Sequence, residues 1–416
     1  MSSLIIEGGN SLNGQINVPG AKNAATPILA ASLLTKDEVV ISNVPQISDV
    51  DKMIKLLEQV GAKCERVGSE VKISAAEVNL ANLDRKLVKG MRSSVLMFGP
   101  LLARLGEVSL PEPGGCIIGN RPLGAHLDSL RKLGATVEIQ GESYCLKAKK
   151  LNGTRIILPE FSVTATENIL MAAVLAEGTT TIELAAAEPH VQDLCNFLVK
   201  IGARISGIGT HTLVIEGVSE LHGTSHNLIP DTIEIGTWAV LGAVSRGEIT
   251  IGPVVPEHLS IILLKLKEIG VDFELRDKYL VVRASRQLKP FRLQALPYPG
   301  FPTDLQAPFT VLATQASGTS LIHDPMYEGR LNHISELVKM GAGAVVADPH
   351  RVVITGPTPL YGREIRTFDL RAGATLIVAA LIAQGETLIH DVENVDRGYE
   401  RLDERLASLG AKIKRV

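Results

Sequence analysis

The sequence predicts an α/β protein made of six similar units of about seventy residues, arranged as two domains of three units each. Three observations predict this fold class. A helix–glycine–strand phrase recurs six times along the 416 residues. A second helix that ends in glycine before a strand precedes the phrase in most units. Six such units are also too many for one hydrophobic core, whereas two groups of three match the usual size of domains.

The recurring phrase reads as an amphipathic helix stopped by a left-handed glycine and followed by a strand, as in LKEIGVDFEL. A turn and another strand usually follow, as in VDFELRDKYLVVRA. Each unit therefore reads helix–strand–loop–helix–strand–turn–strand, with a further strand expected before the first helix. A doubly wound sheet is disfavoured because such sheets lack a hairpin in every unit. The phrase glycines lie 68 to 73 residues apart, at Gly61, Gly134, Gly202, Gly270, Gly341 and Gly410.

The predicted domain boundary lies in the polar, turn-rich stretch HGTSHNLIPD, residues 222–231. The first three-unit domain is expected to cover residues 22–229, and it includes the loop that carries Cys116. The second is expected to combine residues 1–21 with residues 230–416, although the N-terminal stretch could add a strand to either half.

Composition excludes several classes of function. A net charge of −3 provides no global basic field for nucleic acid or an anionic membrane. Apolar runs such as TLIVAALIA are far shorter than the ~20 residues of a membrane span. There is no signal segment, no C-x-x-C pair and no histidine spacing typical of metal ligands, so we expect a cytoplasmic protein with free thiols and no metal or cofactor.

The stretch PEPGGCIIGNRP, residues 111–122, places Cys116 on a loop, because its glycines and prolines rule out a helix or an inner strand. This connection is longer than its counterparts: 28 residues separate Gly106 from Gly134, against 23 to 25 in four other units. Extended loops on rigid scaffolds often carry function, so a lid is predicted. The remaining cysteines, Cys64, Cys145 and Cys195, fit strand or helix patterns and are expected to be core residues.

Cations stand beside turn residues at six separate places. Each could be an ordinary surface charge, but arginine forks and a lysine together suit a small phosphorylated carboxylate. Asp304 in YPGFPTDLQA could be a rigidly held carboxylate or an N-cap for the following helix, and Asp369 could be the partner of Arg371. The six cations are Lys22, Arg92, Arg121, Arg330, Arg371 and Arg397.

Seven motifs, in order and at family spacing, resemble the UDP-N-acetylglucosamine enolpyruvyl transferases over essentially the whole chain. The resemblance implies two inside-out α/β barrels with the active site between them. It also implies transfer of enolpyruvate from phosphoenolpyruvate to the C3 hydroxyl of UDP-N-acetylglucosamine, with release of phosphate, as the first committed step of peptidoglycan synthesis. The motifs are PGAKNAATPILAA, MRSSVLMFGPLLAR, PGGCIIGNRP, PDTIEIGT, FPTDLQA, DLRAGATL and DRGYERLDERLASLGA.

The resemblance also implies roles for single residues. Asp304 would take the proton from the sugar hydroxyl, and Cys116 would assist at C3 of the enol and be alkylated by fosfomycin. Lys22, Arg121 and Arg397 would hold the phosphate and carboxylate of phosphoenolpyruvate, with Arg92 and Arg371 nearby. Arg330 and Asp369 would shape the interdomain cleft. The other expected substrate contacts are Asn23, which would touch both substrates, Pro122, Leu123, Ser162, Val163 and Tyr327.

Departures from the family pattern gather where the nucleotide would lie. Gly124 and Ala125 replace an aspartate and a leucine near the uracil, and Thr164 replaces a glycine that faces the diphosphate. The cysteine loop also carries an extra Glu-Pro at 112–113. A paralogue acting on another nucleotide, or a non-catalytic binding protein on the same scaffold, therefore stays an alternative. The related shikimate-phosphate transferase is disfavoured, because that branch lacks the PGGC cysteine.

Overall fold

The computed structural model describes residues 2–115, 118–119, 121–285 and 287–416. It is a mixed α/β structure, and its described residues form five four-stranded sheets and one three-stranded sheet. The chain divides into two compact units. Unit 1 comprises Met1–Pro19, Cys116–Asn120 and Pro230–Val416, and unit 2 comprises Gly20–Gly115 and Arg121–Ile229. Each unit contains three of the sheets, so the predicted class of six α/β repeats is confirmed.

Two sheets of unit 2 share one arrangement of four strands, and the third has three of these strands. In the third repeat, β9 runs parallel to β10, which pairs antiparallel with β12, which pairs antiparallel with β11. In the described residues of the second repeat, the two antiparallel pairings are present without a parallel strand. The sheet orders are β13 (Thr224–Asn227)–β3 (Val39–Ser42)–β5 (Glu70–Ser74)–β4 (Lys63–Val67), β6 (Glu107–Pro111)–β8 (Ser143–Lys147)–β7 (Thr136–Gln140) and β11 (Arg204–Ser206)–β12 (Thr212–Glu216)–β10 (Thr179–Glu183)–β9 (Arg155–Ile157).

The sheets of unit 1 repeat the same order of one parallel and two antiparallel pairings. Their orders are β15 (Asp272–Arg276)–β16 (Tyr279–Arg283)–β14 (Glu248–Gly252)–β2 (Gly14–Asn17), β17 (Arg292–Gln294)–β18 (Gly318–His323)–β20 (Arg351–Gly356)–β19 (Gly343–Asp348) and β21 (Glu364–Arg366)–β22 (Glu386–His390)–β1 (Leu4–Glu7)–β23 (Lys412–Arg415).

Two strands pair in a unit other than the one whose helix directly follows them in the sequence. β2 comes just before the first helix of unit 2 but pairs with β14 of unit 1. β13 comes just before the first long helix of unit 1 but pairs with β3 of unit 2. The stretch expected to be a polar boundary therefore contains a strand. The N-terminal residues, which could have joined either half, supply β1 and β2 to unit 1.

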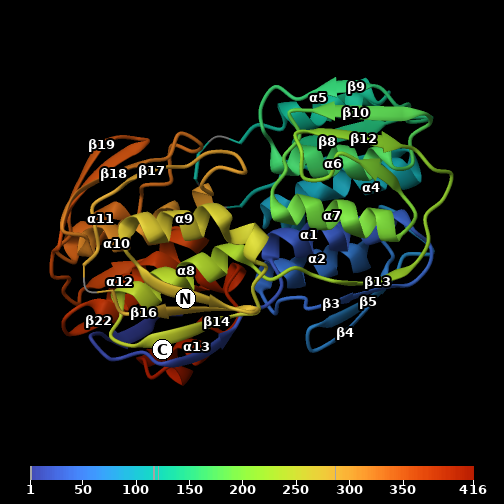
Figure 1. Ribbon diagram of the computed structural model, residues 1–416. Helices are drawn as coiled ribbons and strands as arrows, with labels where there is room; N and C mark the ends of the chain where they lie inside the picture. Colours follow the sequence, from blue (N-terminus) through green and yellow to red (C-terminus); the bar gives the residue numbers. More distant parts are fainter. Residues whose placement is uncertain (1, 116–117, 120, 286) are drawn as a thin grey trace. The chain divides into compact units, whose positions relative to one another are not determined.

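One buried helix from each repeat lies inside its unit, and Figure 1 shows these helices with the strands around them. In α12, for example, every residue from Leu370 to Leu381 is buried. Such helices have no exposed face and must be covered by other elements on every side; α10 packs against both α8 and α12. The six are α1 (Lys22–Ala31), α4 (Phe98–Leu105), α6 (Val163–Ala173), α8 (Thr232–Val244), α10 (Gln306–Gln315) and α12 (Leu370–Ile382).

The second helix of each repeat is only partly buried, and the recurring glycine follows it. All six phrase glycines have φ between 87° and 107°, which confirms the predicted left-handed stop. These helices are α2 (Ser48–Gln59), α5 (Gly124–Lys132), α7 (Pro189–Lys200), α9 (Ser260–Ile269), α11 (Ile334–Lys339) and α13 (Leu402–Ser408). The short segments are α3 (Arg85–Lys89), η1 (Ser32–Leu34), η2 (Arg92–Met97), η3 (Pro256–Leu259), η4 (Thr303–Leu305) and η5 (Val392–Arg397).

Each unit has its own apolar core, centred on Phe98 and Phe197 in unit 2 and on Trp238, Phe309 and Tyr399 in unit 1. Among the helices in the described part of the chain, none has the length and apolar character that crossing a membrane requires.

Only one of the three cysteines expected in the core is fully buried. Cys195 on α7 lies in the core of unit 2, whereas Cys64 packs at the edge of that core. Burial raises the pKa of both thiols to about 12, with smaller contributions from Glu167 and Glu58, so neither is a ready nucleophile. The expectation is wrong for Cys145. Its sulfur lies 3.2 Å from the Ser109 hydroxyl on the accessible face of β8 and β6, while the next residue, Leu146, points into the core.

Candidate functional site

Lys22 is the first residue of α1, and its position is set by the turn before it. Gly20 has no room for a side chain, because a Cβ there would lie 2.0 Å from the carbonyl oxygen of Asn43. The Lys22 ammonium pairs with the Asp49 carboxylate of α2 at 3.0 Å, and the Asp49 side chain is only 2% exposed. A buried carboxylate therefore orients Lys22. The sequence hides this role, since Asp49 resembles an ordinary acidic residue in the first turn of a helix.

Arg92 and Arg121 are brought together in unit 2. Nη2 of Arg92, the first residue of η2, donates a hydrogen bond to the backbone carbonyl of Arg121 at 2.5 Å. Gly115 has a φ of 116°, and a Cβ there would lie 2.8 Å from the Cβ of Arg92, so this end of the cysteine loop packs closely on η2. Arg92 thus fixes the backbone where the segment RPLGAH begins.

Cys116 itself lies outside the described residues, and its expected role stays a prediction. Ile118 and Gly119, which follow it in the loop, are described. The carbonyl of Ile118 accepts a hydrogen bond from the backbone N–H of Gly329 at 2.9 Å. Gly119 passes Glu328 so closely that a Cβ would lie 2.4 Å from the carboxylate oxygen Oε2. This part of the loop is therefore tied to residues 328–329 of unit 1.

A buried histidine organises the start of α6. His126 on α5 is held by Asn168, whose Nδ2 lies 3.0 Å from Nδ1, and by Thr164, whose Oγ1 lies 3.1 Å from Nε2. The amide nitrogen of Asn168 can only donate, so Nδ1 accepts and Nε2–H donates to the Thr164 hydroxyl. Burial, with the nearby charge of Arg92, lowers the pKa of His126 to about 3. The imidazole is therefore neutral, and it holds the side chain of Thr164.

In unit 1, Asp304 is clamped between two arginines. Its Oδ1 accepts from Nη2 of Arg330 at 2.5 Å, and its Oδ2 lies 3.2 Å from Nη2 and 3.3 Å from Nε of Arg371. Asp304 lies inside η4, and no side chain caps η4 or the following α10. The N-cap interpretation of Asp304 is therefore wrong. Its carboxylate is an ion-pair partner, as a rigidly held charged group requires.

In this cluster one carboxylate, that of Asp304, lies between two guanidiniums. Burial opposes charge on both guanidiniums, but the Asp304 carboxylate together with further acidic groups nearby outweighs it, so the pKa of Arg330 and of Arg371 is raised. Two of their N–H donors, Nε of Arg330 and Nη1 of Arg371, are buried without an acceptor in the described structure. Unsatisfied buried donors of charged groups are costly. The arrangement is therefore suited to receive an anionic group.

Aromatic rings line the same two arginines. The Tyr327 ring centroid lies 5.2 Å from Cζ of Arg330, and the Tyr399 ring centroid lies 5.6 Å from Cζ of Arg371. Both distances are within the range of cation–π interaction, which helps to keep a guanidinium in a fixed orientation. Tyr399 was not identified from the sequence, because its spacing from Arg371 gives no sign of contact.

Asp369 does not pair with the Arg371 side chain as expected. Its Oδ1 accepts from the backbone N–H groups of Arg371 and Ala372 at 2.8 and 3.0 Å, so it is the N-cap of α12. The prediction was wrong because a capping aspartate and an ion-pairing aspartate look the same at this spacing. By starting the helix at Leu370, Asp369 still sets the position from which Arg371 reaches Asp304.

The other predicted contact residues are placed individually. Leu123 and Ala125 are buried, and Pro122 is exposed. Gly124 starts α5 with open space where a Cβ would be, so a side chain is missing there. Asn23 follows Lys22 in α1, and Arg397 is the last residue of η5. Ser162 is the N-cap residue of α6 but makes no capping hydrogen bond, and Val163 opens that helix.

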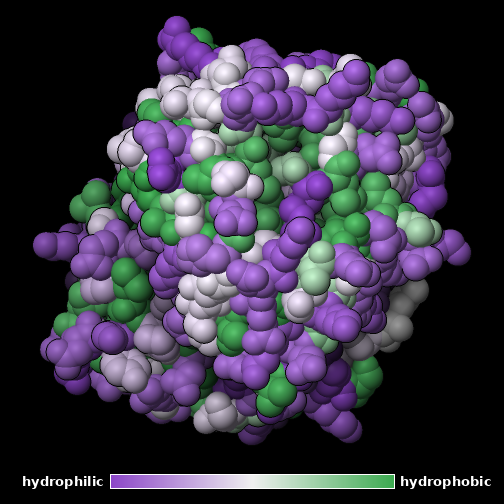
Figure 2. Space-filling model, turned by 90° about the vertical axis from the view of Figure 1, so that its right-hand side faces the viewer, coloured by the Kyte–Doolittle hydropathy of each residue, from purple (hydrophilic) through white to green (hydrophobic). Residues whose placement is uncertain are grey.

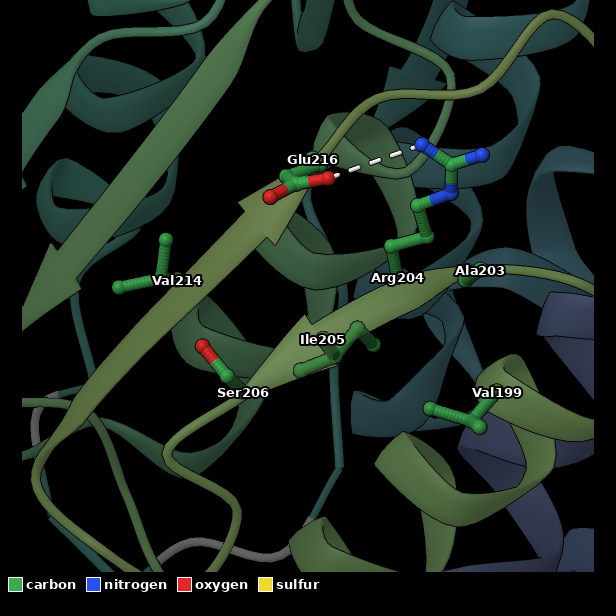
Figure 3. Close-up of a pocket in the computed structure, with 7 residues that line it drawn as sticks. All are labelled: Val199, Ala203, Arg204, Ile205, Ser206, Val214 and Glu216. Atoms are coloured by element: carbon green, nitrogen blue, oxygen red, sulfur yellow. Dashed lines mark ion pairs between the residues drawn. The ribbon is translucent and has the colours of Figure 1, made fainter.

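A separate pocket of about 290 Å³ lies against the end of α7 and strands β11 and β12 of unit 2 (Figure 3). Its lining combines apolar side chains with polar ones, and Arg204 and Glu216 form an ion pair of 3.7 Å across the two strands. None of the predicted site residues lines it.

On the face drawn in Figure 2, hydrophilic side chains interrupt the apolar ones, so this face shows no continuous apolar surface. Within the residues that the structure describes, no cluster of three or more histidine, cysteine or acidic side chains could hold a metal ion.

Comparison with known proteins gives consistent matches over the full chain. The sequence model of the EPSP synthase (3-phosphoshikimate 1-carboxyvinyltransferase) family matches residues 6–406. UDP-N-acetylglucosamine 1-carboxyvinyltransferase 1 of Caldanaerobacter subterraneus subsp. tengcongensis is 45% identical over 415 residues, covering 100% of this chain and 99% of that protein. The protein of that name from Magnetococcus marinus is also 45% identical, with 100% of both chains covered.

Two solved structures share the fold. The enolpyruvyl transferase NikO from Streptomyces tendae has a TM-score of 0.92 at 27% identity, covering 100% of this chain and 99% of that one. EPSP synthase from Acinetobacter baumannii has a TM-score of 0.77 at 19% identity, with both chains fully covered, and supports the fold alone.

The neutral state of His126 predicts a pH-dependent stability. Between pH 6.5 and about 3 the unfolded chain binds a proton that the folded imidazole does not, so the free energy of unfolding falls as pH decreases through this range. Unfolding by denaturant should be measured at pH 7 and at pH 5. Between these two values the free energy of unfolding should fall by about 2 kcal/mol less in His126→Gln than in wild type. His222→Gln, at an exposed position, should lose as much as wild type. Equal losses in all three proteins would contradict the assignment.

Proposed function

The chain belongs to the EPSP synthase (3-phosphoshikimate 1-carboxyvinyltransferase) family, and from this we propose that it transfers enolpyruvate from phosphoenolpyruvate to the C3 hydroxyl of UDP-N-acetylglucosamine. Phosphate is released, and the step commits the sugar nucleotide to peptidoglycan. The name shared by relatives 43–45% identical over the full chain supports this acceptor. The observation that carries the proposal is Asp304 held between Arg330 and Arg371, with guanidinium donors left for an anion.

The cations have an electrostatic role in this reaction. Phosphoenolpyruvate carries a phosphate and a carboxylate, and the charges of both must be held while C2 becomes cationic and until the phosphate leaves. Lys22, Arg121 and Arg397 hold these groups, as the resemblance implies, and Arg371 offers a further donor. Because Asp49 already orients Lys22, this charge is in place before the substrate arrives. Preorganised charge of this kind is usually the largest catalytic contribution.

The covalent steps need one proton acceptor and one proton donor. Protonation of the enol at C3 makes C2 electrophilic, and the sugar oxygen bonds to C2 as its proton passes to Asp304. Loss of phosphate from C2 and of a proton from C3 then restores the double bond. A carboxylate is a weak base toward an alcohol, so Asp304 acts only as the new C–O bond forms, and its position matters more than its basicity. Cys116 is proposed as the group that assists at C3.

Another nucleotide remains the alternative acceptor because of two residues, Gly124 and Thr164, at positions where the resemblance places the nucleotide. Gly124 has no side chain to contact a base, and the Thr164 side chain is bound to His126. These features distinguish this chain from the family pattern without touching the transfer residues. An enolpyruvyl transferase acting on another nucleotide is therefore the alternative. Since phosphoenolpyruvate and sugar nucleotides are cytoplasmic metabolites, we place the reaction in the cytoplasm.

Release of inorganic phosphate tests the proposed acceptor. The purified protein with phosphoenolpyruvate should release phosphate at the highest kcat/KM with UDP-N-acetylglucosamine, and only weakly with UMP or N-acetylglucosamine 1-phosphate. Titration calorimetry should give the same order of affinities. A preference for UMP would support the alternative acceptor, and no release with any nucleotide would contradict enolpyruvyl transfer.

Asp304→Asn should separate binding from chemistry. The amide keeps the shape of the side chain but cannot accept a proton, so turnover should fall on the order of 10²-fold or more while UDP-N-acetylglucosamine still binds. Lys22→Ala should also lose about 10²-fold in rate, as removal of one preorganised donor typically does. Circular dichroism controls for folding, because removing a buried charge partner destabilises. A folded Asp304→Asn protein that turns over normally would remove this residue from the mechanism.

Fosfomycin tests the proposed thiol. A thiolate beside cations is a good nucleophile, so fosfomycin should add once, at Cys116, and faster in the presence of UDP-N-acetylglucosamine. Intact-protein and peptide mass spectrometry locate the adduct, with Cys116→Asp as the matched control that should stay unmodified. Modification of Cys64, Cys145 or Cys195, or an unmodified wild type, would show that Cys116 is not the reactive thiol.

A further inference from the structure

Asp324 lies directly after β18 in unit 1, and its side chain is fully buried (0% exposed). Its backbone is anchored to His350: the Asp324 N–H donates to the His350 carbonyl at 2.7 Å, and Nδ1 of His350 donates to the Asp324 carbonyl at 2.8 Å. The Oδ2 atom accepts from the Thr303 hydroxyl at 2.6 Å, and Oδ1 accepts from the Met326 N–H at 3.0 Å. Both carboxylate oxygens are therefore engaged, and rotation of the side chain would leave buried polar groups unpaired.

The two donors to Asp324 belong to the two segments that form the Asp304 cluster. Thr303 is the first residue of η4, and Asp304 follows it directly. Met326 lies in the loop that leads from Asp324 to Arg330, and Arg330 returns to Asp304 at 2.5 Å. The contacts thus form a closed ring from Asp324 through Thr303 and Asp304 to Arg330, and back along the loop.

We propose that Asp324 is a positioning residue for the transfer reaction, which holds the turn carrying Asp304 and the loop carrying Arg330 in a fixed relation through Thr303 and Met326. The inference rests on the proposed function, because that function gives Asp304 its role. The buried side chain of Asp324 does not itself need to touch a substrate.

A contact such as the Thr303–Asp324 hydrogen bond is needed because the two arginines have two roles. Arg330 and Arg371 hold Asp304 by ion pairs, and their remaining N–H donors are those available to an anionic substrate. A substrate that draws the guanidiniums toward itself would also move Asp304. The Thr303–Asp324 hydrogen bond involves neither guanidinium, so it keeps η4 in place while the arginines bind and release their ligand.

The electrostatics of Asp324 agree with this geometry. Burial raises its pKa, whereas the hydrogen bonds from Thr303 and Met326 and the charge of Arg330 act in the opposite direction. Loss of the Thr303 hydroxyl therefore removes one of the few groups that stabilise a buried anion. The contact between Thr303 and Asp324 is then lost, and the charged form of Asp324 is also less stable.

Thr303→Val tests the proposal, because valine keeps the shape of threonine and removes only the hydroxyl. At a temperature well below the unfolding midpoint, kcat should fall about tenfold to a hundredfold, as expected when a reacting group is misplaced by about 1 Å. The KM for UDP-N-acetylglucosamine should change little. Thr303→Ser restores the hydroxyl and should recover most of the rate. Asp324→Asn, which loses one acceptor, should lower kcat in the same direction.

Ser320→Ala on β18 is the matched control for lost stability. Its buried hydroxyl accepts from the Phe291 N–H at 3.1 Å, so this variant should lower the unfolding midpoint while keeping kcat. A crystal structure of Thr303→Val should show the Asp304 carboxylate displaced from one of its arginines. An unmoved Asp304, or a Thr303→Val enzyme with wild-type kcat, would overturn the proposal. Wild-type protein without transferase activity would instead contradict the proposed function, and the structure of the variant would still decide the role of Asp324.

Discussion

Enclosing six helices that have no exposed face is the constraint on which the rest of this structure depends. Helices such as α10 and α12 are buried along nearly their whole length, so water must be kept from every side of them. Each unit meets this demand with three small sheets and a second, amphipathic helix per repeat. The left-handed glycines let the chain turn back at once from that helix into the covering strand.

The same enclosure explains the chemistry of the site. The half-buried Asp304 and the buried Arg330 and Arg371 are all charged, and charge can stay there only because ion pairs, tyrosine rings and a capped backbone hold it. In the same way, the buried Asp49 carboxylate forms an ion pair with Lys22. In both units a candidate site cation therefore has a carboxylate partner, which is buried in the case of Asp49 and half-buried in the case of Asp304. The cost of desolvating these partners is offset by an orientation that does not have to be found when a substrate binds.

The sequence predicts repeats well because glycine and apolar periodicity are local signals, and the six glycines and most elements lie where expected. It also locates residues such as Asp304 and Arg371 through motifs. Pairing is not local, so the sequence does not show that β2 and β13 change places or that β1 lies between β22 and β23. The roles of Asp369, Asp49 and His126 were missed or mistaken for the same reason, since a carboxylate or an imidazole acquires its role only from the groups that the fold brings to it.

The position of β1 also governs the order in which the molecule can be completed during synthesis. The strands of unit 2 lie between residues 39 and 227, so all of them are synthesised before β14 and the later strands of unit 1. β1 precedes the other described strands in the sequence, but its partners, residues 386–389 and 412–415, belong to β22 and β23, which follow the other described strands. The apolar Leu4 and Ile6 of β1 must therefore wait until β22 and β23 have been synthesised, and unit 1 can close only after all the strands of unit 2 are present.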